Sequence, residues 1–136
     1  MAGGERGPIS SFEDLIVWQK AVDVADLVLE LTEEGPISRR FWLCNQVGDA
    51  AASISANIAE GHDGGSRRVY LRHLYIARGS SAETLTFLRI IHRRRYCDEA
   101  KLSAIRGLLV EVRKMLNALI NRLEEQPGEK DNPRDS

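Results

Sequence analysis

Apolar residues recur at alternating steps of three and four through the last third of the chain. The series consists of Leu102, Ile105, Leu109, Val112, Leu116, Leu119 and Leu123. This spacing places every member on one side of an α-helix, whereas a half-buried strand would alternate apolar and polar residues. Asp98 precedes the series at a position suited to a helix N-cap, and Pro127 and Gly128 follow it. The pattern therefore predicts a long amphipathic helix.

Three earlier segments show the same helical spacing. The first opens with the stretch SFEDL, the second covers about residues 39–60, and the third covers residues 66–94. The first contains two apolar series: Leu15, Trp18, Val22, Ala25 and Leu29, and Val17, Ala21, Val24, Val28 and Leu31. The third contains the series Tyr70, Leu74, Ala77, Ser81, Thr84, Leu88 and Ile91. The second is rich in alanine, whose small side chain lets helix axes approach closely.

Short linkers, EEGPIS, GHDGGS and RYCD, join these segments. Because short connections make long helices antiparallel to their neighbours in sequence, the predicted fold is all-α, an antiparallel up-down-up-down four-helix bundle. We expect residues 1–11 to form a flexible N-terminal segment and residues 12–124 to form the bundle. Residues 125–136 should form a disordered acidic and polar tail, because they contain no large apolar side chain. A chain of 136 residues suffices for one hydrophobic core.

The composition, with 43% hydrophobic and 29% charged residues, is ordinary for a globular protein. No apolar run approaches about 18 residues and the N-terminus lacks the apolar core of a signal peptide, so we expect a cytoplasmic protein that does not span a membrane. Cys44 and Cys97 lie far apart, which favours two reduced thiols, one of them buried, over a disulfide. His62, His73 and His92 are also scattered. We expect neither a metal site nor a cofactor.

Polar residues of the stretch ANIAEGHDGGS stand at the predicted end of the second helix. Gly61 occupies a position where a helix often ends on a left-handed residue, and Ser66 is placed to cap the next helix. Asn57 has two interpretations: a hydrogen bond to free carbonyls or to a neighbouring helix, which is favoured, or contact with a ligand. Because the helix dipole disfavours an anion at a C-terminus, we expect an arginine near Glu60. Asn57, Glu60 and Gly61 thus form a candidate helix-terminus motif.

The first helix carries a wider apolar surface than a helix in a monomeric bundle needs. Its two apolar series together cover much of its circumference. One interpretation is that this helix also contacts a partner subunit, and the other is that it is simply the most buried helix of the bundle. The sequence does not decide between these two interpretations.

Positive charge is concentrated in the middle of the chain, although the net charge is −1. Residues 38–95 contain ten arginines, no lysine and four acidic residues. At about 100° per residue, Arg68, Arg72, Arg89 and Arg93 fall within roughly a third of the circumference of the third helix. This arginine stripe is a candidate nucleic-acid-binding site, because arginine suits bidentate phosphate contact. The alternative is a solvated face paired with acidic residues of the first helix, and three tyrosines are too few to predict a base-stacking surface.

Three stretches of the sequence resemble a known family. They are FEDLIVWQKAVDVADLVLELT, QVGDAAASISANIAEG and SRRVYLRHLYIARGSSAE. They are similar to the four-helix bundle proteins encoded in intervening sequences of bacterial 23S rRNA genes, and to the accessory variability proteins of diversity-generating retroelements. The resemblance covers about residues 12–123. It implies a ring-like homopentamer without known catalytic activity, which in the retroelement branch binds nucleic acid and a reverse transcriptase.

The chain departs from the family pattern at two places. Family members commonly carry a leucine and two arginines after the position of Gln46, where this chain has Val47, Gly48 and Asp49. A nucleic-acid role here therefore cannot depend on that basic pair. The usual proline before the alanine of ANIAEG is Ser55 here, which should straighten the helix.

The residues do not indicate an enzyme. An acid–base pair of His73 with Glu60 or Glu83 would need a geometry that the sequence does not supply, and Cys97 lacks an activating histidine motif. Glycine inside a helix lowers stability by about 1 kcal/mol relative to alanine, so its presence needs a packing reason. Gly79 therefore predicts a close crossing of two helices. We expect a non-catalytic homo-oligomer that binds RNA, DNA or a nucleoprotein enzyme. The alternative is a scaffolding oligomer that docks a protein partner without binding nucleic acid.

Overall fold

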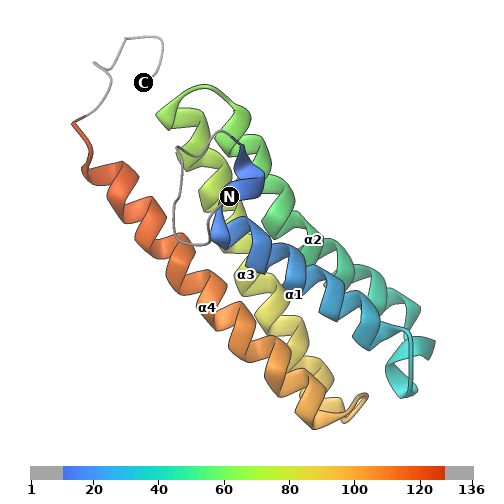
Figure 1. The fold of residues 1–136 in the computed structure, drawn as a ribbon. Coiled ribbons are helices and arrows are strands. Elements are labelled where there is room, and N and C mark those ends of the chain that lie inside the picture. The colour runs from blue at the N-terminus through green and yellow to red at the C-terminus, as the bar shows by residue number, and fades with distance from the viewer. Residues whose placement is uncertain (1–10, 128–136) are drawn as a thin grey trace, which may run out of the picture.

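The structure is a computed structural model that describes residues 11–127. Its four long helices are α1 (Ile16–Thr32), α2 (Phe41–Asp63), α3 (Arg67–Arg94) and α4 (Glu99–Glu125). Short 3₁₀ helices, η1 (Phe12–Asp14) and η2 (Pro36–Arg39), precede α1 and α2. Figure 1 shows successive helices running in opposite directions. The predicted all-α four-helix bundle is confirmed, and residues 11–127 contain no strand.

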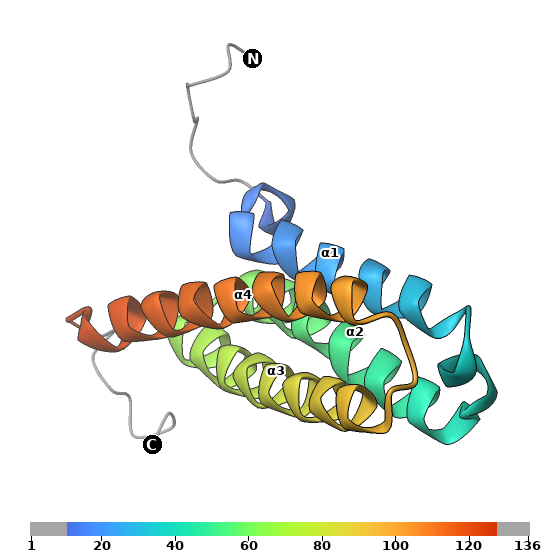
Figure 2. The ribbon, with the colours of Figure 1, turned by 90° about the horizontal axis from the view of Figure 1, so that it is seen from below.

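The bundle closes because α1 packs on α2 and α4, while α3 packs on the same two helices. Figure 2 shows α1 and α3 on opposite sides of the bundle. The contact between α2 and α3 is the most extensive of the four. Side chains on α3 therefore meet those of α2 and α4 far more than those of α1.

The core is one cluster built largely from the predicted apolar series. α1 contributes Val17, Ala21, Val24, Val28 and Leu31. The α3 series is buried except for Tyr70, which is half-buried. In α4 the series is confirmed as far as Leu116, but beyond it Ile120 is buried and Leu119 is only half-buried. The physical reason is that a helix has 3.6 residues per turn, so a strict 3.5-residue series drifts away from the core.

The prediction that the second helix ends at Gly61 is wrong. α2 continues to Asp63, its C-cap is Gly64, and the left-handed residue is Gly65, with a φ of 83°. Gly61 is buried within the helix, where an added Cβ would lie 2.7 Å from the Cβ of His73. Gly61 therefore permits the close packing of α2 on α3 and does not form the turn.

The predicted N-caps of α3 and α4 are confirmed. The hydroxyl oxygen of Ser66 accepts a hydrogen bond from the N–H of Val69 at 3.2 Å. A carboxylate oxygen of Asp98 accepts hydrogen bonds from the N–H groups of Ala100 and Lys101 at 2.7 and 3.3 Å. Each cap satisfies backbone donors of the first helical turn that have no partner within the helix.

The prediction of a close helix crossing at Gly79 is also wrong. Gly79 is exposed, and a Cβ added there would meet no atom within 4 Å. α2 and α3 instead meet at the next residue, where the hydroxyl groups of Ser53 and Ser80 share a hydrogen bond of 2.9 Å. On the side of α4, a guanidinium nitrogen of Arg113 donates to the buried hydroxyl of Ser81 at 2.8 Å. Hydroxyl side chains, not glycine, therefore make the helix contacts at the middle of α3.

The predicted N-terminal segment and polar tail fall mostly on residues 1–10 and 128–136, which lie outside the described residues. Gln126 and Pro127, the first residues after α4, are exposed and non-helical. Within residues 11–127, no helix is both long enough and apolar enough to cross a membrane.

Candidate functional site

All four members of the arginine stripe are exposed on α3. Arg68 and Arg72 lie in the first two turns of the helix, and Arg89 and Arg93 lie in the last two. Arg72 and Arg89 are separated by about 25 Å along the axis, at 1.5 Å per residue. The structure therefore places the stripe as two basic pairs at opposite ends of α3, and it does not bring the four arginines into one continuous surface.

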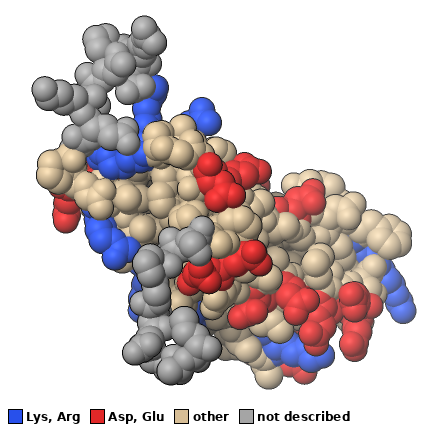
Figure 3. All heavy atoms as spheres, turned by 45° about the horizontal axis from the view of Figure 1, so that its top comes forward, with Lys and Arg blue, Asp and Glu red and all other residues tan. Residues whose placement is uncertain are grey.

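Ion pairs with the acidic residues of α1 do not account for these arginines. Within residues 11–127, Arg72, Arg89 and Arg93 form no ion pair. The Nζ of Lys20 in α1 instead lies 2.8 Å from a carboxylate oxygen of Glu111 in α4. Figure 3 shows Asp and Glu side chains across the middle of one face, with most of the visible Lys and Arg toward its ends.

Asn57 and Glu60 of α2 form a polar contact with His73 of α3. The amide nitrogen of Asn57 donates to the carbonyl and hydroxyl oxygens of Ser53 at 2.8 and 3.0 Å. The Nδ1 of His73 lies 3.0 Å from the amide oxygen of Asn57 and 3.5 Å from a carboxylate oxygen of Glu60. Asn57 thus bonds a neighbouring helix, as the favoured interpretation expected. The expectation of an arginine beside Glu60 is wrong, because its partner is His73.

This contact joins α2 and α3. The side chain of His73 is only 16% exposed, whereas that of Glu60 is 64% exposed. Within residues 11–127, the side-chain partners of His73 are Asn57 and Glu60. The arrangement supports the packing of α2 on α3, next to Gly61.

Cys44 and Cys97 are free thiols, as predicted, but the expectation that one of them is buried is wrong, because both are half-buried. Burial raises the pKa of the Cys44 thiol, which donates a hydrogen bond to the carbonyl oxygen of Ile37 at 3.1 Å. Burial, with a smaller effect from the Asp98 carboxylate, raises the pKa of the Cys97 thiol. Both thiols are therefore less reactive than an ordinary cysteine. No group of three or more His, Cys, Asp or Glu residues within 11–127 is placed to hold a metal ion.

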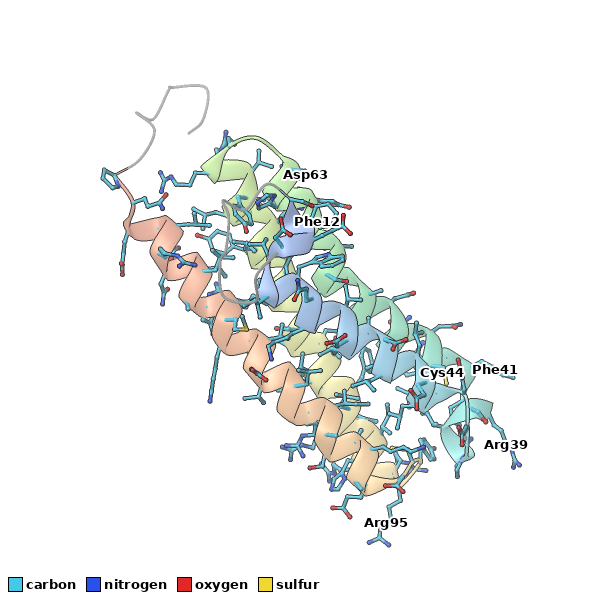
Figure 4. All side chains as sticks on the ribbon, in the orientation of Figure 1. Phe12, Arg39, Phe41, Cys44, Asp63 and Arg95 are labelled. Atoms are coloured by element: carbon cyan, nitrogen blue, oxygen red, sulfur yellow. The ribbon has the colours of Figure 1, made fainter. Side chains whose placement is uncertain are left out.

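Sequence reasoning missed a cluster of arginine and aromatic residues at one end of the bundle. Residues 39–42 read RRFW and span the start of α2, while residues 93–96 read RRRY and span the end of α3. The antiparallel course of α2 and α3 brings the two stretches together, and Figure 4 shows Arg39, Phe41 and Arg95 at this end. Each stretch was visible in the sequence as a basic and aromatic run, but their proximity depends on the helix pairing.

A groove of about 400 Å³, here called the end groove, lies between these stretches. Its lining residues are Arg40, Phe41, Trp42, Leu43, Ile90, Arg94 and Tyr96. Phe41 is 76% exposed and Trp42 is 68% exposed, the largest fractions among the exposed large apolar residues of the described chain. The guanidinium carbons of Arg40 and Arg94 lie 4.8 and 5.7 Å from the centroid of the Tyr96 ring. The end groove therefore combines exposed rings with stacked guanidinium groups.

A hydrogen bond from Arg94, with a smaller effect from arginine charges, lowers the pKa of Tyr96. The main cause is a hydrogen bond of 3.4 Å, donated by the Nε of Arg94 to the phenol oxygen, while desolvation opposes it and arginine charges add to it. The other two tyrosines behave oppositely. Burial raises the pKa of Tyr70, and the hydrogen bond of 2.6 Å that Tyr75 donates to Glu124 raises the pKa of Tyr75.

The fold and surface define a four-helix bundle protein with a basic, aromatic end. The chain belongs to the 23S rRNA-intervening sequence protein family, whose model matches residues 13–118, and the resemblance found in the sequence is thereby confirmed. A crystal structure of a protein with unknown function from the S23 ribosomal protein family, from Bacteroides thetaiotaomicron, has the same fold. It matches with a TM-score of 0.71 and 24% sequence identity, covering 77% of this chain and 98% of that chain. No curated protein matches the sequence significantly.

Proposed function

We propose that this protein is a non-catalytic homo-oligomer, pentameric as the family resemblance implies, that binds nucleic acid through the arginines of α3. The observation that carries this proposal is the exposure of Arg72, Arg89 and Arg93 without a carboxylate partner within residues 11–127. Guanidinium groups that no carboxylate engages are available to bind phosphate oxygens bidentately. A protein of this kind would act in the cytoplasm, as expected from the sequence.

The outer face of α1 supports the proposed assembly. One of the two apolar series of α1 is buried in the core, but Val22 and Leu29 of the other series are 36% and 51% exposed. Leu29 lies over Gly48 of α2, where an added Cβ would be 3.5 Å from its Cδ2. An exposed apolar helix face favours contact with another subunit. This exposure supports the partner-subunit interpretation of α1 over complete burial within one bundle.

The charge for nucleic-acid binding comes from α3 and the end of the bundle in this proposal. Gly48 and Asp49 stand where family members commonly have two arginines, and neither supplies a cation. Gly48 is half-buried beside α1, whereas Asp49 is exposed. Binding is therefore expected on α3 and at the end of the bundle, and not around this part of α2.

The proposal is tested by changing Arg68, Arg72, Arg89 and Arg93 to glutamine. We expect the affinity for a structured RNA fragment at low salt to fall at least tenfold. Each lost phosphate contact should also reduce the slope of log affinity against log salt by about 0.7 to 0.9. Fluorescence anisotropy at several salt concentrations measures both quantities.

A matched control changes Lys101, Lys114 and Arg122 to glutamine, because these exposed cations lie on α4. This control should retain most of the affinity and most of the salt dependence. Unchanged RNA binding by the α3 variant, with its helix content retained, would contradict the proposed site.

A scaffolding oligomer that docks a protein, such as a reverse transcriptase, is the second candidate. The observation that favours it is the exposure of Ile76 on α3 and Val110 on α4, which are 46% and 40% exposed on helices other than α1. This candidate predicts an assembly whose mass does not change when RNA is added at any salt concentration.

A further inference from the structure

The two most exposed aromatic rings of the described residues, Phe41 and Trp42, lie at the end groove. Trp42 contacts Phe87 of α3 through an edge-to-face arrangement, with ring centroids 6.2 Å apart and planes at 81°. This contact fixes the indole against α3 while most of it stays in solvent. Phe41 beside it is still more exposed. Adjacent large rings in water are unusual on the surface of a stable domain and typical of binding surfaces.

Arginines lie beside these rings, and no carboxylate of the described residues forms an ion pair with them. Within residues 11–127, no ion pair involves Arg39, Arg40, Arg93 or Arg94. The residues that line the end groove include no carboxylate. Glu34 and Asp98 lie at the same end of the bundle, but they line a separate pocket that includes Arg95. The end groove therefore presents a positive potential, and the charges of Arg40 and Arg94 add to the effect of the hydrogen bond that lowers the pKa of Tyr96.

A single-stranded nucleic acid fits this combination better than a protein does. Unpaired bases stack on aromatic side chains and on the planes of guanidinium groups, while the connecting phosphates contact cations. An apolar protein surface would cover the rings but would desolvate the arginines without pairing them, which is costly. A duplex hides the faces of its bases, so it would use the arginines and leave the rings in water.

We propose that the end groove binds unpaired bases of a single-stranded nucleic acid, with bases stacked on Phe41 and Trp42 and phosphates held by Arg40 and Arg94. This inference rests on the proposed function and adds the kind of nucleic acid and its contacts. The end groove contains Ile90 and Arg94, neighbours in sequence of Arg89 and Arg93. One strand could therefore engage both the rings and that end of the arginine stripe.

The fluorescence of Trp42 provides a direct test. The only other tryptophan, Trp18, contacts Phe12 with ring centroids 5.3 Å apart, so a Trp18→Phe variant leaves Trp42 as the sole emitter. We expect oligouridylate to quench this emission saturably at low salt, because a stacked base contacts the indole. An RNA duplex of equal length should bind without comparable quenching.

A second measurement removes the rings. The double variant Phe41→Ala/Trp42→Ala should bind oligouridylate about tenfold or more weakly, while its affinity for the duplex stays unchanged. The matched control Ile76→Ala/Val110→Ala removes apolar side chains that are exposed elsewhere and should change neither affinity. Circular dichroism and light scattering verify that both variants keep the fold and the mass of the parent.

The outcomes separate this inference from the proposed function. Binding of oligouridylate without quenching, unaffected by loss of the rings, would overturn the inference and leave the proposed function standing. Absence of binding to every nucleic acid at low salt would overturn both. A fall in mass on Phe41→Ala/Trp42→Ala would show that the end groove holds a second copy of the chain, which also overturns the inference.

Discussion

Tyr96 reports the electrostatic character of the end groove at the scale of one residue. Its pKa is lowered chiefly by the hydrogen bond from Arg94, whereas the pKa values of Tyr70 and Tyr75 are raised. In an alkaline titration followed by ultraviolet absorbance, Tyr96 should therefore lose its proton first. An Arg94→Gln variant removes the hydrogen bond and a positive charge, so the earliest transition should move to higher pH.

The assignment of that transition is checked with Tyr96→Phe, which should abolish the earliest step and leave the other two in place. An earliest step that persists in Tyr96→Phe, or that does not move in Arg94→Gln, would contradict the positive potential inferred for the end groove.

Residues whose role depends on local sequence could be predicted, and residues whose role depends on a distant neighbour could not. Ser66 and Asp98 cap helices by bonding N–H groups two or three residues away, so spacing alone identifies them. The partner of Glu60 and the importance of Trp42 depend on which part of α3 lies opposite α2. The spacing of residues within one helix does not show which residues of another helix lie opposite it.

At the scale of elements, the contact between α2 and α3 depends on Gly61 and not on Gly79. Both lie inside helices, but Gly61 is buried against His73 and Tyr70, whereas Gly79 is exposed. The sequence suggested the opposite roles, a turn for Gly61 and a helix crossing for Gly79. The sequence shows that a glycine lies inside each helix, but only the packing of α2 on α3 shows which glycine allows a close approach.

Alanine substitution of the two glycines should therefore act in opposite directions. Gly61→Ala adds a Cβ at 2.7 Å from the Cβ of His73 and 3.1 Å from a ring carbon of Tyr70, so we expect a loss of about 1–3 kcal/mol of stability. Gly79→Ala meets no neighbour and should gain roughly 0.5–1 kcal/mol from the better helix propensity of alanine. Urea unfolding of both variants at one protein concentration measures the difference.

The two variants serve as controls for each other, since they make the same chemical change in neighbouring helices. Equal effects, or a more stable Gly61→Ala protein, would show that α2 and α3 do not approach as closely as the structure places them.

At the scale of the whole molecule, the fold was predictable because four helical patterns and short linkers leave few arrangements. The core followed from the same patterns, apart from the drift that buries Ile120 in place of Leu119. The surface was less predictable. The arginine stripe proved to be two separated pairs, and the end groove became visible only when residues 39–42 and 93–96 met across the α2–α3 contact.

The proposed assembly would use an apolar surface that one bundle leaves uncovered. Val22 and Leu29 of α1 are exposed, whereas the series that begins with Val17 is buried in the core. Contact with a neighbouring subunit would bury Val22 and Leu29 as well. Five copies around a ring would also repeat the basic ends of the bundle, which multiplies the phosphate contacts available to one nucleic acid.

The most direct test of this account is the solution mass, measured by light scattering at low and high salt with and without a structured RNA. We expect a mass near five times the 15.2 kDa of one chain, which rises with RNA only at low salt. A Val22→Glu/Leu29→Glu variant should be monomeric, whereas Val110→Glu on α4 should keep the parent mass. A parent protein of single-chain mass at both salt concentrations would contradict the proposed assembly and, with it, the account of α1.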